Sequence, residues 1–448
     1  MAGLCALSVN PAVYKGNFAE DLFWATFYQQ HLGEEYCGLA VQKDDKVKVQ
    51  ARSGLFRPNF SNSFKDLKGG EGIGYCGATK QPIFAYSKLG QLTVCFSGNI
   101  INCSELVHEL KSRGSIFERE DEVEIIIHLI AQGNNIIDGL KNVGQKVRGA
   151  YTILVLNEGG IYAVRGQNGH WPLVIGEKTG AVVVASESGG FSNLGFKLVR
   201  DFKPGEIIFI ENGKVKIKGM IPSEKIQICS FIWVYTAFAN GVFEGIPASL
   251  VRKRLGAALA RRDIETGFIP DIVAPVPDSG RFHAIGYFQE FCREIAEGKI
   301  DHVPFYDELL LKYPYAGRSY TPQIQRTRDQ EAHIKILGSG EDYTGKKVVI
   351  CDDSIVRGTQ TQTNLVPKLR SLGIGEIHFR ISNPELLSHC PWGKTTKKGE
   401  VLAARLPRKE DRLKFLGVQS LEYNTIDDLV RAIGLPRERL CVDCDLLH

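Results

Sequence analysis

A single stretch in the second half of the chain, residues 347–361, restricts the possible folds more than any other. The apolar run Val348–Cys351 predicts a buried strand, and two adjacent carboxylates, Asp352 and Asp353, follow it directly. A loop with glycine and hydroxyl side chains comes next, and a helical pattern begins at Thr361. Two adjacent acids alone are equally consistent with a plain strand–turn–helix whose acids lie in solvent. The whole stretch favours ligand binding, because ligands of parallel α/β sheets bind at the carboxyl ends of strands.

The same stretch suits a phosphorylated sugar as its ligand. Amide groups of such a loop and of the following helix N-terminus can hold a phosphate. Adjacent carboxylates beside a phosphate are suited to ribose hydroxyls and to a divalent cation, since Mg²⁺ prefers oxygen ligands.

The chain is long enough for two domains. Its 448 residues exceed what one hydrophobic core usually serves. In the first half, strand-like runs such as Leu92–Phe96 and Tyr151–Leu156 alternate with turns, and helical patterns occur at Phe18–His31 and Val123–Ala131. Many strands with a few buried helices predict an α+β sandwich of sheets and helices.

The second half has a different pattern. Apolar strands at Ile272–Val276 and Val348–Cys351 alternate with helical patterns at Ala248–Arg262 and Thr361–Leu372. This alternation is typical of a parallel sheet with crossover helices. We therefore predict an α/β protein with a boundary near Ile228, which gives domains 1–228 and 229–448.

Composition excludes several classes of function. A net charge of +4 gives no electrostatic reason to bind nucleic acid or a membrane surface. No apolar run approaches the roughly 20 residues of a membrane span, and no signal peptide is visible at the N-terminus. We expect a cytoplasmic protein. Its 11 cysteines, an odd number, argue for thiols or metal ligands rather than a disulfide framework.

The stretch at the acidic pair resembles a known motif. It is similar to the PRPP-binding loop of type I phosphoribosyltransferases, in the form carried by glutamine PRPP amidotransferases. The resemblance implies that Asp352 and Asp353 contact ribose and Mg²⁺. It also implies that the 5′-phosphate is surrounded by Ser354, Arg357, Gly358, Thr359 and Thr361. That family usually has a second Thr after Thr359, whereas this chain has Gln360.

Two further segments agree with the same family. The segment 275–281 follows an apolar strand and resembles the family's pyrophosphate loop, with Asp278, Ser279 and Gly280, although a Pro/Gly turn is the alternative. Ser279 would complete the Mg²⁺ shell. The segment 312–318 resembles the loop that closes over PRPP, so Lys312 and Arg318 would neutralise the departing pyrophosphate. The chain departs from the family at Pro314, where the family has a basic residue.

Four cysteines stand where one subset of this family carries a [4Fe–4S] cluster. They are Cys229, Cys390, Cys441 and Cys444, the last two in a Cys-x-x-Cys pair. Four thiolates suit such a cluster, and they also suit tetrahedral zinc. The family resemblance favours the cluster, in a structural role that holds the C-terminal tail to the core.

The first half resembles the family's glutamine-hydrolysing domain in outline. In that family the processed chain starts with Cys-Gly, and the free amine serves as the base for the thiol. The best alignment places Ala2 at that start, and alanine cannot attack an amide. Trimming to expose Cys5 is an alternative, but Cys5 is followed by Ala6 rather than Gly. An engineered replacement is another alternative, but it would leave the partner residues intact.

The partner residues are altered as well. The family's Arg for the glutamine carboxylate falls in the segment 75–78, which contains none, and its oxyanion segment reads Phe96-Ser97-Gly98-Asn99. Leu32 replaces a family Arg, and Glu122 aligns with the family's Asp for the glutamine amine. Several independent changes at one site predict a natural loss of glutamine hydrolysis.

The leading hypothesis is therefore a PRPP-dependent, amidophosphoribosyltransferase-like enzyme. It would use Mg²⁺ and displace pyrophosphate with ammonia or another amine, without using glutamine. A second hypothesis is a specialised paralogue that binds a purine nucleotide monophosphate for other group-transfer chemistry. A third is a regulatory pseudoenzyme. The resemblance also implies a homodimer or homotetramer.

Overall fold

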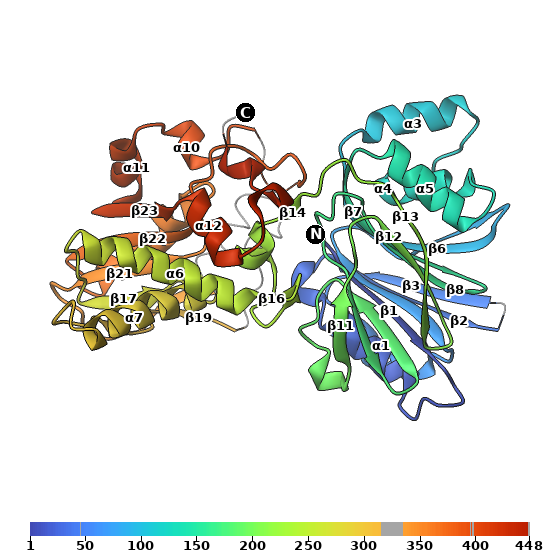
Figure 1. Ribbon diagram of the computed structural model, residues 1–448, viewed down its shortest axis with the longest axis horizontal. Coiled ribbons are helices and arrows are strands. Elements are labelled where there is room, and N and C mark those ends of the chain that lie inside the picture. Colours follow the sequence, from blue (N-terminus) through green and yellow to red (C-terminus); the bar gives the residue numbers. More distant parts are fainter. Residues whose placement is uncertain (45, 315–334, 395, 397, 447–448) are drawn as a thin grey trace. The chain divides into compact units, whose positions relative to one another are not determined.

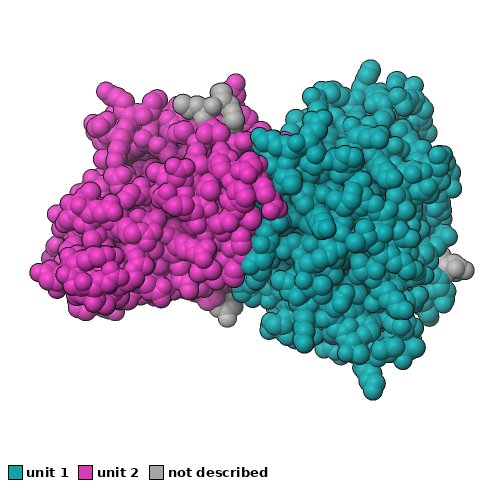
Figure 2. Space-filling view, viewed as in Figure 1, with its two compact units in different colours: residues 1–229, 240–245 teal, residues 230–239, 246–448 magenta. Residues whose placement is uncertain are grey.

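The computed structural model describes residues 1–44, 46–314, 335–394, 396 and 398–446 (Figure 1). The chain forms two compact units (Figure 2). Unit 1 consists of residues 1–229 and 240–245, and unit 2 consists of residues 230–239 and 246–448. The chain therefore passes between the units three times, because the short segment 240–245 returns to unit 1.

Unit 1 contains two antiparallel sheets (Figure 1). The seven-stranded sheet has the order β11-β9-β10-β1-β4-β2-β3 and consists of β1 (Gly3–Val9), β2 (Tyr36–Lys43), β3 (Lys46–Ser53), β4 (Glu71–Gly77), β9 (Val174–Lys178), β10 (Ala181–Ala185) and β11 (Lys197–Asp201). The six-stranded sheet has the order β13-β12-β8-β7-β6-β5 and consists of β5 (Ile83–Ser87), β6 (Gly90–Ile100), β7 (Gly149–Asn157), β8 (Gly160–Arg165), β12 (Glu206–Glu211) and β13 (Lys214–Met220).

Helices cover the outer faces of both sheets. The α-helices of unit 1 are α1 (Phe18–Phe27), α2 (Phe56–Phe60), α3 (Cys103–Ser112), α4 (Glu122–Ala131) and α5 (Ile136–Lys146), with 3₁₀ turns at Gln30–Leu32, Phe64–Asp66 and Ser192–Leu194. Strand β1 shows how the layers form. Leu4 and Ala6 enter the core between the sheets, whereas Cys5 and Leu7 pack on the α1 side. This two-sided burial gives the sandwich predicted from the sequence.

Unit 2 is built on a five-stranded parallel sheet of order β18-β17-β21-β22-β23. Its strands are β17 (Ile272–Pro275), β18 (Phe305–Tyr306), β21 (Lys347–Asp352), β22 (Glu376–Pro384) and β23 (Ser420–Asn424). Its helices are α6 (Ala248–Glu265), α7 (Arg281–Ala296), α9 (Val366–Ser371), α10 (Leu402–Arg405), α11 (Lys409–Leu416) and α12 (Ile426–Ile433). The predicted parallel sheet with crossover helices is confirmed.

Both faces of this sheet are buried. Val349 and Cys351 of β21 pack with residues of α6 and α7, and Val348 and Ile350 pack on the opposite face with α9, α10 and α11. An uninterrupted apolar strand is the pattern expected for a parallel strand covered on both sides. The carboxyl end of β21 is therefore packed on both faces. Asp352 is the last residue of this strand, and Asp353 comes directly after it.

Short elements complete the chain. They are β14 (Ile228–Cys229), β15 (Val242–Phe243), β16 (Ile246–Pro247), β19 (Leu310–Lys312), β20 (Ile336–Gly338), β24 (Leu440–Cys441), π-helical turns at Ile232–Thr236 and Thr361–Leu365, and 3₁₀ turns at Arg437–Arg439 and Asp443–Asp445. Strands β19 and β20 form an antiparallel pair. Within the described residues, no helix is long and apolar enough to cross a membrane.

Two predicted helices differ from the observed ones. The helix predicted over Phe18–His31 ends at Phe27. The side chain of Gln29 instead exchanges two hydrogen bonds with the backbone of Glu187, at 3.0 and 3.1 Å. The helix predicted over Thr361–Leu372 starts as a wide π turn and becomes α-helical at Val366. Pro367, which has no amide hydrogen, lies at that change.

Candidate active site

The acidic pair lies at the carboxyl end of β21 and is buried. Asp352 and Asp353 are only 8% and 5% exposed. The hydroxyl of Ser279 donates to Oδ1 of Asp352 at 2.9 Å, and the hydroxyl of Ser354 donates to Oδ2 of Asp353 at 2.6 Å. The structure thus brings together the three residues expected around Mg²⁺, Ser279, Asp352 and Asp353.

The electrostatics of this pair favour a cation. Burial, together with the neighbouring Asp353 carboxylate, raises the pKa of Asp352 well above its usual value. Burial also raises the pKa of Asp353. Two ionised carboxylates in this position repel each other, and a bound divalent cation would remove that repulsion. The oxygen-only set of two carboxylates and one hydroxyl therefore fits Mg²⁺.

The candidate pyrophosphate loop lies beside the acidic pair. Strands β17 and β21 are parallel neighbours, and the amide of Val276 donates to the carbonyl of Cys351 at 2.9 Å. Gly280 approaches the same carbonyl so closely that a Cβ atom there would overlap its oxygen. Only glycine allows this approach. The loop 276–280 is therefore fixed against the strand that ends in Asp352.

Lys312 of β19 reaches the same loop. Its Nζ forms an ion pair with Oδ2 of Asp278 at 2.6 Å. Arg281, the first residue of α7, pairs with Asp278 at 3.3 Å and with Glu308 at 3.0 Å. Lys312 is thus placed beside the candidate pyrophosphate loop, while Arg318 lies outside the described residues.

The loop expected to hold the 5′-phosphate is shaped by residues from α10 and α11. Gly358 has a φ of +73°, a conformation that favours glycine, and a Cβ atom there would lie 3.1 Å from the side chains of Leu402 and Leu416. The amide of Leu402 donates to the carbonyl of Val356 at 2.7 Å. One loop and the turn that follows it contain all the residues expected here: Ser354, Arg357, Gly358, Thr359 and Thr361.

Two residues near this loop were not found from the sequence. Glu400 forms an ion pair with the guanidinium of Arg357. The amide of Asn383 in β22 donates to the carbonyl of Asp353 at 2.8 Å. Glu400 is far along the chain from Arg357 and no local pattern connects them, whereas Asn383 could have been suspected as the end of the neighbouring strand.

The C-terminal cysteine pair docks onto the segment that contains Cys390. The carbonyl of Cys444 accepts hydrogen bonds from the amides of Leu387 and Ser388, at 2.9 and 3.1 Å. The carbonyl of Cys441 accepts one from the hydroxyl of Ser230, at 2.8 Å, and Ser230 directly follows Cys229 in the chain. The backbone around the cysteines is therefore held by several hydrogen bonds.

The backbone hydrogen bonds do not by themselves arrange the four thiols as a metal site. Burial raises the pKa of the Cys390 thiol, and the backbone amides of Trp392 and Gly393 oppose that shift. Such amide donors are suited to a ligating thiolate. In the described parts of the chain, no group of three or more His, Cys, Asp or Glu side chains is arranged to hold a metal ion. The donor chemistry fits a cluster, but its thiols would have to turn toward one another.

Ala2, the residue before β1, is packed into the core of unit 1, and we call its surroundings, with Tyr75, Gly77 and Ser97, the N-terminal pocket. Ala2 is 8% exposed, and its backbone nitrogen donates to the hydroxyl of Ser97 at 2.7 Å. Gly77 faces it across the pocket. A Cβ atom at Gly77 would overlap the hydroxyl of Tyr75 and would lie 2.7 Å from Cβ of Ala2. No side chain longer than glycine's fits at residue 77 without displacing these neighbours.

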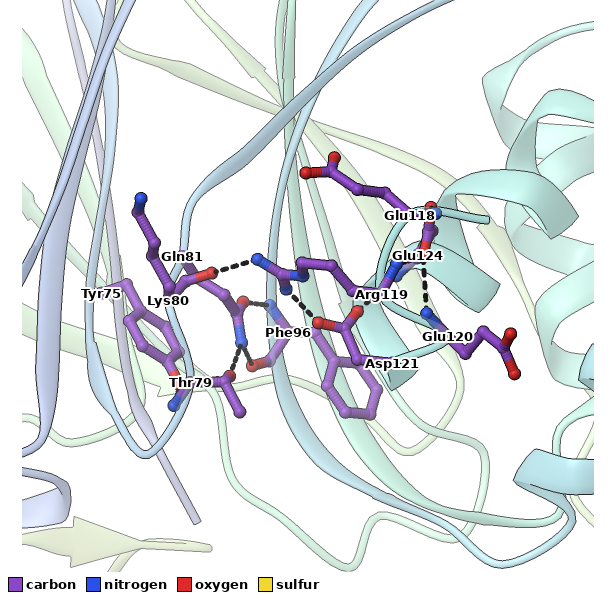
Figure 3. A network of polar contacts seen from close by, with 10 residues as sticks. All are labelled: Tyr75, Thr79, Lys80, Gln81, Phe96, Glu118, Arg119, Glu120, Asp121 and Glu124. Carbon is purple, nitrogen blue, oxygen red and sulfur yellow. Dashed lines mark hydrogen bonds and ion pairs between the residues drawn. The ribbon is translucent and has the colours of Figure 1, made fainter. Parts of the chain in front are cut away.

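Hydrogen bonds hold the loop 77–82, which begins at Gly77, in place (Figure 3). The side chain of Gln81 donates to the carbonyl of Phe96 at 3.2 Å and accepts from its amide at 2.7 Å. The guanidinium of Arg119 donates to the carbonyl of Lys80 at 3.3 Å. The loop is therefore fixed on both sides by residues of its own unit.

Three residues that depart from the glutamine-hydrolysing family, or lie next to such a position, have clear surroundings in the structure. Leu32 is buried, and Glu122 accepts a hydrogen bond from the amide of Ile100 at 2.8 Å. Cys76 is fully buried among apolar side chains, and burial raises the pKa of its thiol well above the usual range. A protonated, enclosed thiol is a poor nucleophile.

Comparisons with known proteins agree with this architecture. Residues 74–193 match the family model of the glutamine amidotransferase domain. The amidophosphoribosyltransferase of Methanothermobacter thermautotrophicus is 32% identical over 444 residues, covering 96% of this chain and 90% of the relative. The amidophosphoribosyltransferase of Bacillus subtilis is 32% identical over 418 residues, covering 90% and 85%.

Solved structures show the same fold. Glutamine PRPP amidotransferase from B. subtilis, complexed with ADP and GMP, superposes with a TM-score of 0.85 at 30% identity and covers 99% of this chain and 96% of its own. A second structure, an allosteric regulatory enzyme of purine biosynthesis, gives a TM-score of 0.85 at 28% identity. The fold and these likenesses define an enzyme of the pentosyltransferase class. The chain belongs to the amidophosphoribosyltransferase family.

Proposed function

We propose that this protein transfers the phosphoribosyl group of PRPP to ammonia, with Mg²⁺, and does not hydrolyse glutamine. The observation that carries the proposal is a contrast between two sites. The buried acids Asp352 and Asp353 meet Ser279 at a strand end suited to PRPP. At the N-terminal pocket, Ala2 offers no nucleophile and Gly77 has no room for a side chain.

Asp352, Asp353 and Ser279 would hold the cation. Their oxygens form a set suited to Mg²⁺, which when bound would supply positive charge beside the pyrophosphate group. The acids are also suited to accept hydrogen bonds from the ribose hydroxyls. Their raised pKa values in the free protein are consistent with a site that awaits a cation.

The loop 354–361 would bind the 5′-phosphate. Gly358, at a φ of +73°, shapes the loop, whose backbone amides and the hydroxyls of Thr359 and Thr361 would donate to the phosphate. The hydroxyl of Ser354 would join them after leaving Asp353. Arg357 supplies a guanidinium, which is suited to phosphate. Glu400 already pairs with that guanidinium and holds it near the loop.

The pyrophosphate would leave through the loop 276–280. In the reaction, the C1–O bond to pyrophosphate breaks and its electron pair leaves with pyrophosphate. The nitrogen lone pair of ammonia forms the new C1–N bond, and the surplus proton passes to solvent. Lys312, now paired with Asp278, would exchange that carboxylate for the developing negative charge of pyrophosphate, together with Arg318. Asp278 and Gly280 would shape the loop around the leaving group.

Loss of glutamine hydrolysis is supported by several features of unit 1 taken together. The family's nucleophile is a cysteine thiol with a free amine as its base, and Ala2 lacks the thiol. The position opposite is a crowded glycine, Gly77, so a guanidinium for the substrate carboxylate has no place there. Leu32 removes a second cation. Restoring one residue would not restore the site.

The cysteines Cys229, Cys390, Cys441 and Cys444 are proposed to hold a [4Fe–4S] cluster with a structural role. The docking of residues 441–444 onto residues 387–388 supports this, as do the amide groups near the Cys390 thiol. Bound there, a cluster would cross-link the tail to the parallel-sheet unit. Iron analysis of protein purified without oxygen tests this proposal, and zinc in place of iron would overturn it.

The function is tested by pyrophosphate release from PRPP and Mg²⁺, with protein purified anaerobically. Ammonia, glutamine and no amine are compared at equal concentration of PRPP. We expect release with ammonia, and release with glutamine no faster than without amine. Glutamine-dependent release would overturn the proposal, and an absence of release with either amine would overturn the transferase activity.

A second candidate is binding of a purine nucleotide monophosphate in the same loop for other chemistry. Gln360 favours it, because it replaces a hydroxyl residue of the family and its side-chain oxygen accepts from Asn364 at 2.8 Å. The B. subtilis relative was solved with GMP. Tight binding of a nucleotide monophosphate with no pyrophosphate release would favour this candidate over the first.

A further inference from the structure

The C-terminal segment 441–445 docks through more contacts than its two cysteines. The hydroxyl of Ser388 donates to the carbonyl of Asp443 at 3.1 Å, and the indole nitrogen of Trp392 donates to Oδ2 of Asp443 at 2.8 Å. These contacts join the amides of residues 387 and 388 that bind the carbonyl of Cys444. One side chain of the segment, that of Asp445, points to a different partner.

Asp445 is buried and contacts the strand that neighbours the acidic pair. It is 4% exposed, and its Oδ1 accepts a hydrogen bond from Nδ2 of Asn383 at 2.8 Å. Asn383 is fully buried near the end of β22. Its backbone amide donates to the carbonyl of Asp353 at 2.8 Å. Two hydrogen bonds through one residue therefore connect the tail to the acidic pair.

We propose that Asp445 is a positioning residue for the PRPP–Mg²⁺ site, acting through Asn383 on Asp353. This inference rests on the proposed function of the acidic pair. Asn383 holds the peptide group of Asp353, and the orientation of that peptide sets the direction of the carboxylate. Asp445 in turn fixes the side chain of Asn383. The docking of the cysteine-containing tail is thereby transmitted to the site where the cation and PRPP bind.

Asp445 and Asn383 are both buried, so the hydrogen bond between them cannot easily be replaced by one to water. A buried carboxamide that loses its acceptor cannot turn to water and has to find another partner. Among the residues that the structure describes, the acceptor left to Nδ2 of Asn383 without Asp445 is the carbonyl of Pro384, at 2.8 Å. We expect a rearrangement of this side chain to shift the backbone amide of the same residue, which donates to Asp353. Small displacements of a positioned group reduce binding and rate strongly.

The alternative is that Asp445 only holds the tail in place. Trp392 separates the two possibilities, because its hydrogen bond to Asp443 holds the same tail without contacting Asn383. A variant at Trp392 that keeps an aromatic ring, Trp392→Phe, loosens the tail and leaves the path through Asn383 intact. It serves as the matched control.

The test measures binding of PRPP with Mg²⁺ by calorimetry, without amine, well below the unfolding temperature of each full-length variant. Asp445→Ala is expected to weaken PRPP binding about tenfold, the effect of one buried hydrogen bond. Asp445→Asn keeps an acceptor oxygen and is expected to bind like the unaltered protein. Trp392→Phe is expected to unfold at a lower temperature with unchanged affinity.

Equal affinity of Asp445→Ala and the unaltered protein would overturn the proposal, and so would equal weakening by Trp392→Phe. If Asp445→Ala does not fold, Asp445→Ser replaces it, because its hydroxyl is too short to reach Asn383 and the same loss is expected. Iron and zinc content are measured for every variant, so a loss of affinity that follows metal content alone also overturns it. Failure of the unaltered protein to bind PRPP would instead overturn the proposed function.

Discussion

The acidic pair of unit 2 and the N-terminal pocket of unit 1 satisfy their polar groups in opposite ways. At the end of β21, two buried carboxylates lie next to each other with hydroxyls as side-chain donors, and their pKa values are raised. In the loop that follows Gly77 of unit 1, the side chain of Gln81 instead makes neutral hydrogen bonds with the backbone of Phe96 (Figure 3).

If the proposed function is right, this difference separates a site that binds a charged ligand from one that no longer binds its ligand. A site that binds a charged ligand keeps groups that are poorly satisfied while the ligand is absent, at a cost in stability. A site without a ligand has no such requirement, so its residues can relax into a well-packed core. Tyr75 illustrates the second case, because it is only 2% exposed and its hydroxyl lies 3.2 Å from the hydroxyl of Thr79.

The largest expected effect is at Asp353. Asp353→Asn should lower ammonia-dependent pyrophosphate release by a factor of roughly a hundred to a thousand, because an amide cannot supply the negative charge that holds the cation. Initial rates at saturating PRPP measure this. Ser97→Ala, in the other pocket, is the control and should leave the rate unchanged. An Asp353→Asn rate within a few-fold of the original would contradict the proposal that the acidic pair of unit 2 binds the cation.

Lys312 should give the next largest effect. Lys312→Ala is expected to lower kcat by about ten- to a hundredfold with a smaller change in KM for PRPP, since its charge acts mainly on the leaving pyrophosphate. Steady-state kinetics with ammonia measure both. The matched control is Lys299→Ala, a lysine whose ion pairs with Glu294 and Glu297 lie on the end of α7. A change in KM alone would contradict the role in departure.

The stability cost of the acidic pair can be measured directly. Burial and Asp353 raise the pKa of Asp352 in the folded protein, so the folded state holds its proton at pH values where the unfolded chain has lost it. The cost to stability therefore grows as pH rises from near 4, the usual pKa of Asp. Asp352→Asn should raise the unfolding temperature of the ligand-free protein by a few degrees at about pH 7.5.

That gain should shrink as pH falls toward about 4, where both proteins are neutral at residue 352. Differential scanning calorimetry without Mg²⁺ or PRPP, at several pH values, checks the sign. The control is Ser97→Ala, for which no such pH dependence is expected. A gain that increases at low pH, or an Asp352→Asn protein that is less stable than the original near neutral pH, would contradict the electrostatic account.

The sequence predicted the fold through its two contrasting periodicities. The uninterrupted apolar run of β21 and the crossover helices predicted the parallel sheet, and the short runs in the first half predicted the sandwich. Helix ends were less accurate, because the end of α1 depends on Gln29 meeting Glu187, 158 residues away. The acidic loop could be found because its residues are contiguous. Glu400 and Asp445 could not, since only folding brings Glu400 to Arg357 and Asp445 to Asn383, the residue that contacts Asp353.

The smallest expected effect is at Ala2, and it tests the other side of the comparison. Protein prepared with cysteine as its first residue, by the substitution Ala2→Cys and removal of Met1, should still not hydrolyse glutamine. The thiol and amine would be restored, but a side chain at Gly77 would overlap the hydroxyl of Tyr75, and the buried Leu32 stands where the resemblance expects an Arg. Nucleophile and binding groups act as a unit, so one of them alone recovers little.

Glutamate release from glutamine measures this, with an affinity label for reactive thiols as a second readout of whether the introduced thiol is exposed. Labelling without hydrolysis would mean that the thiol is accessible and that the missing cations prevent turnover. Neither labelling nor hydrolysis would mean that the packing around Tyr75 closes the pocket. Glutamate release near the rate of ammonia-dependent transfer would show instead that only the nucleophile was lost, and the contrast between a relaxed pocket and a charged one would then reduce to a single side chain.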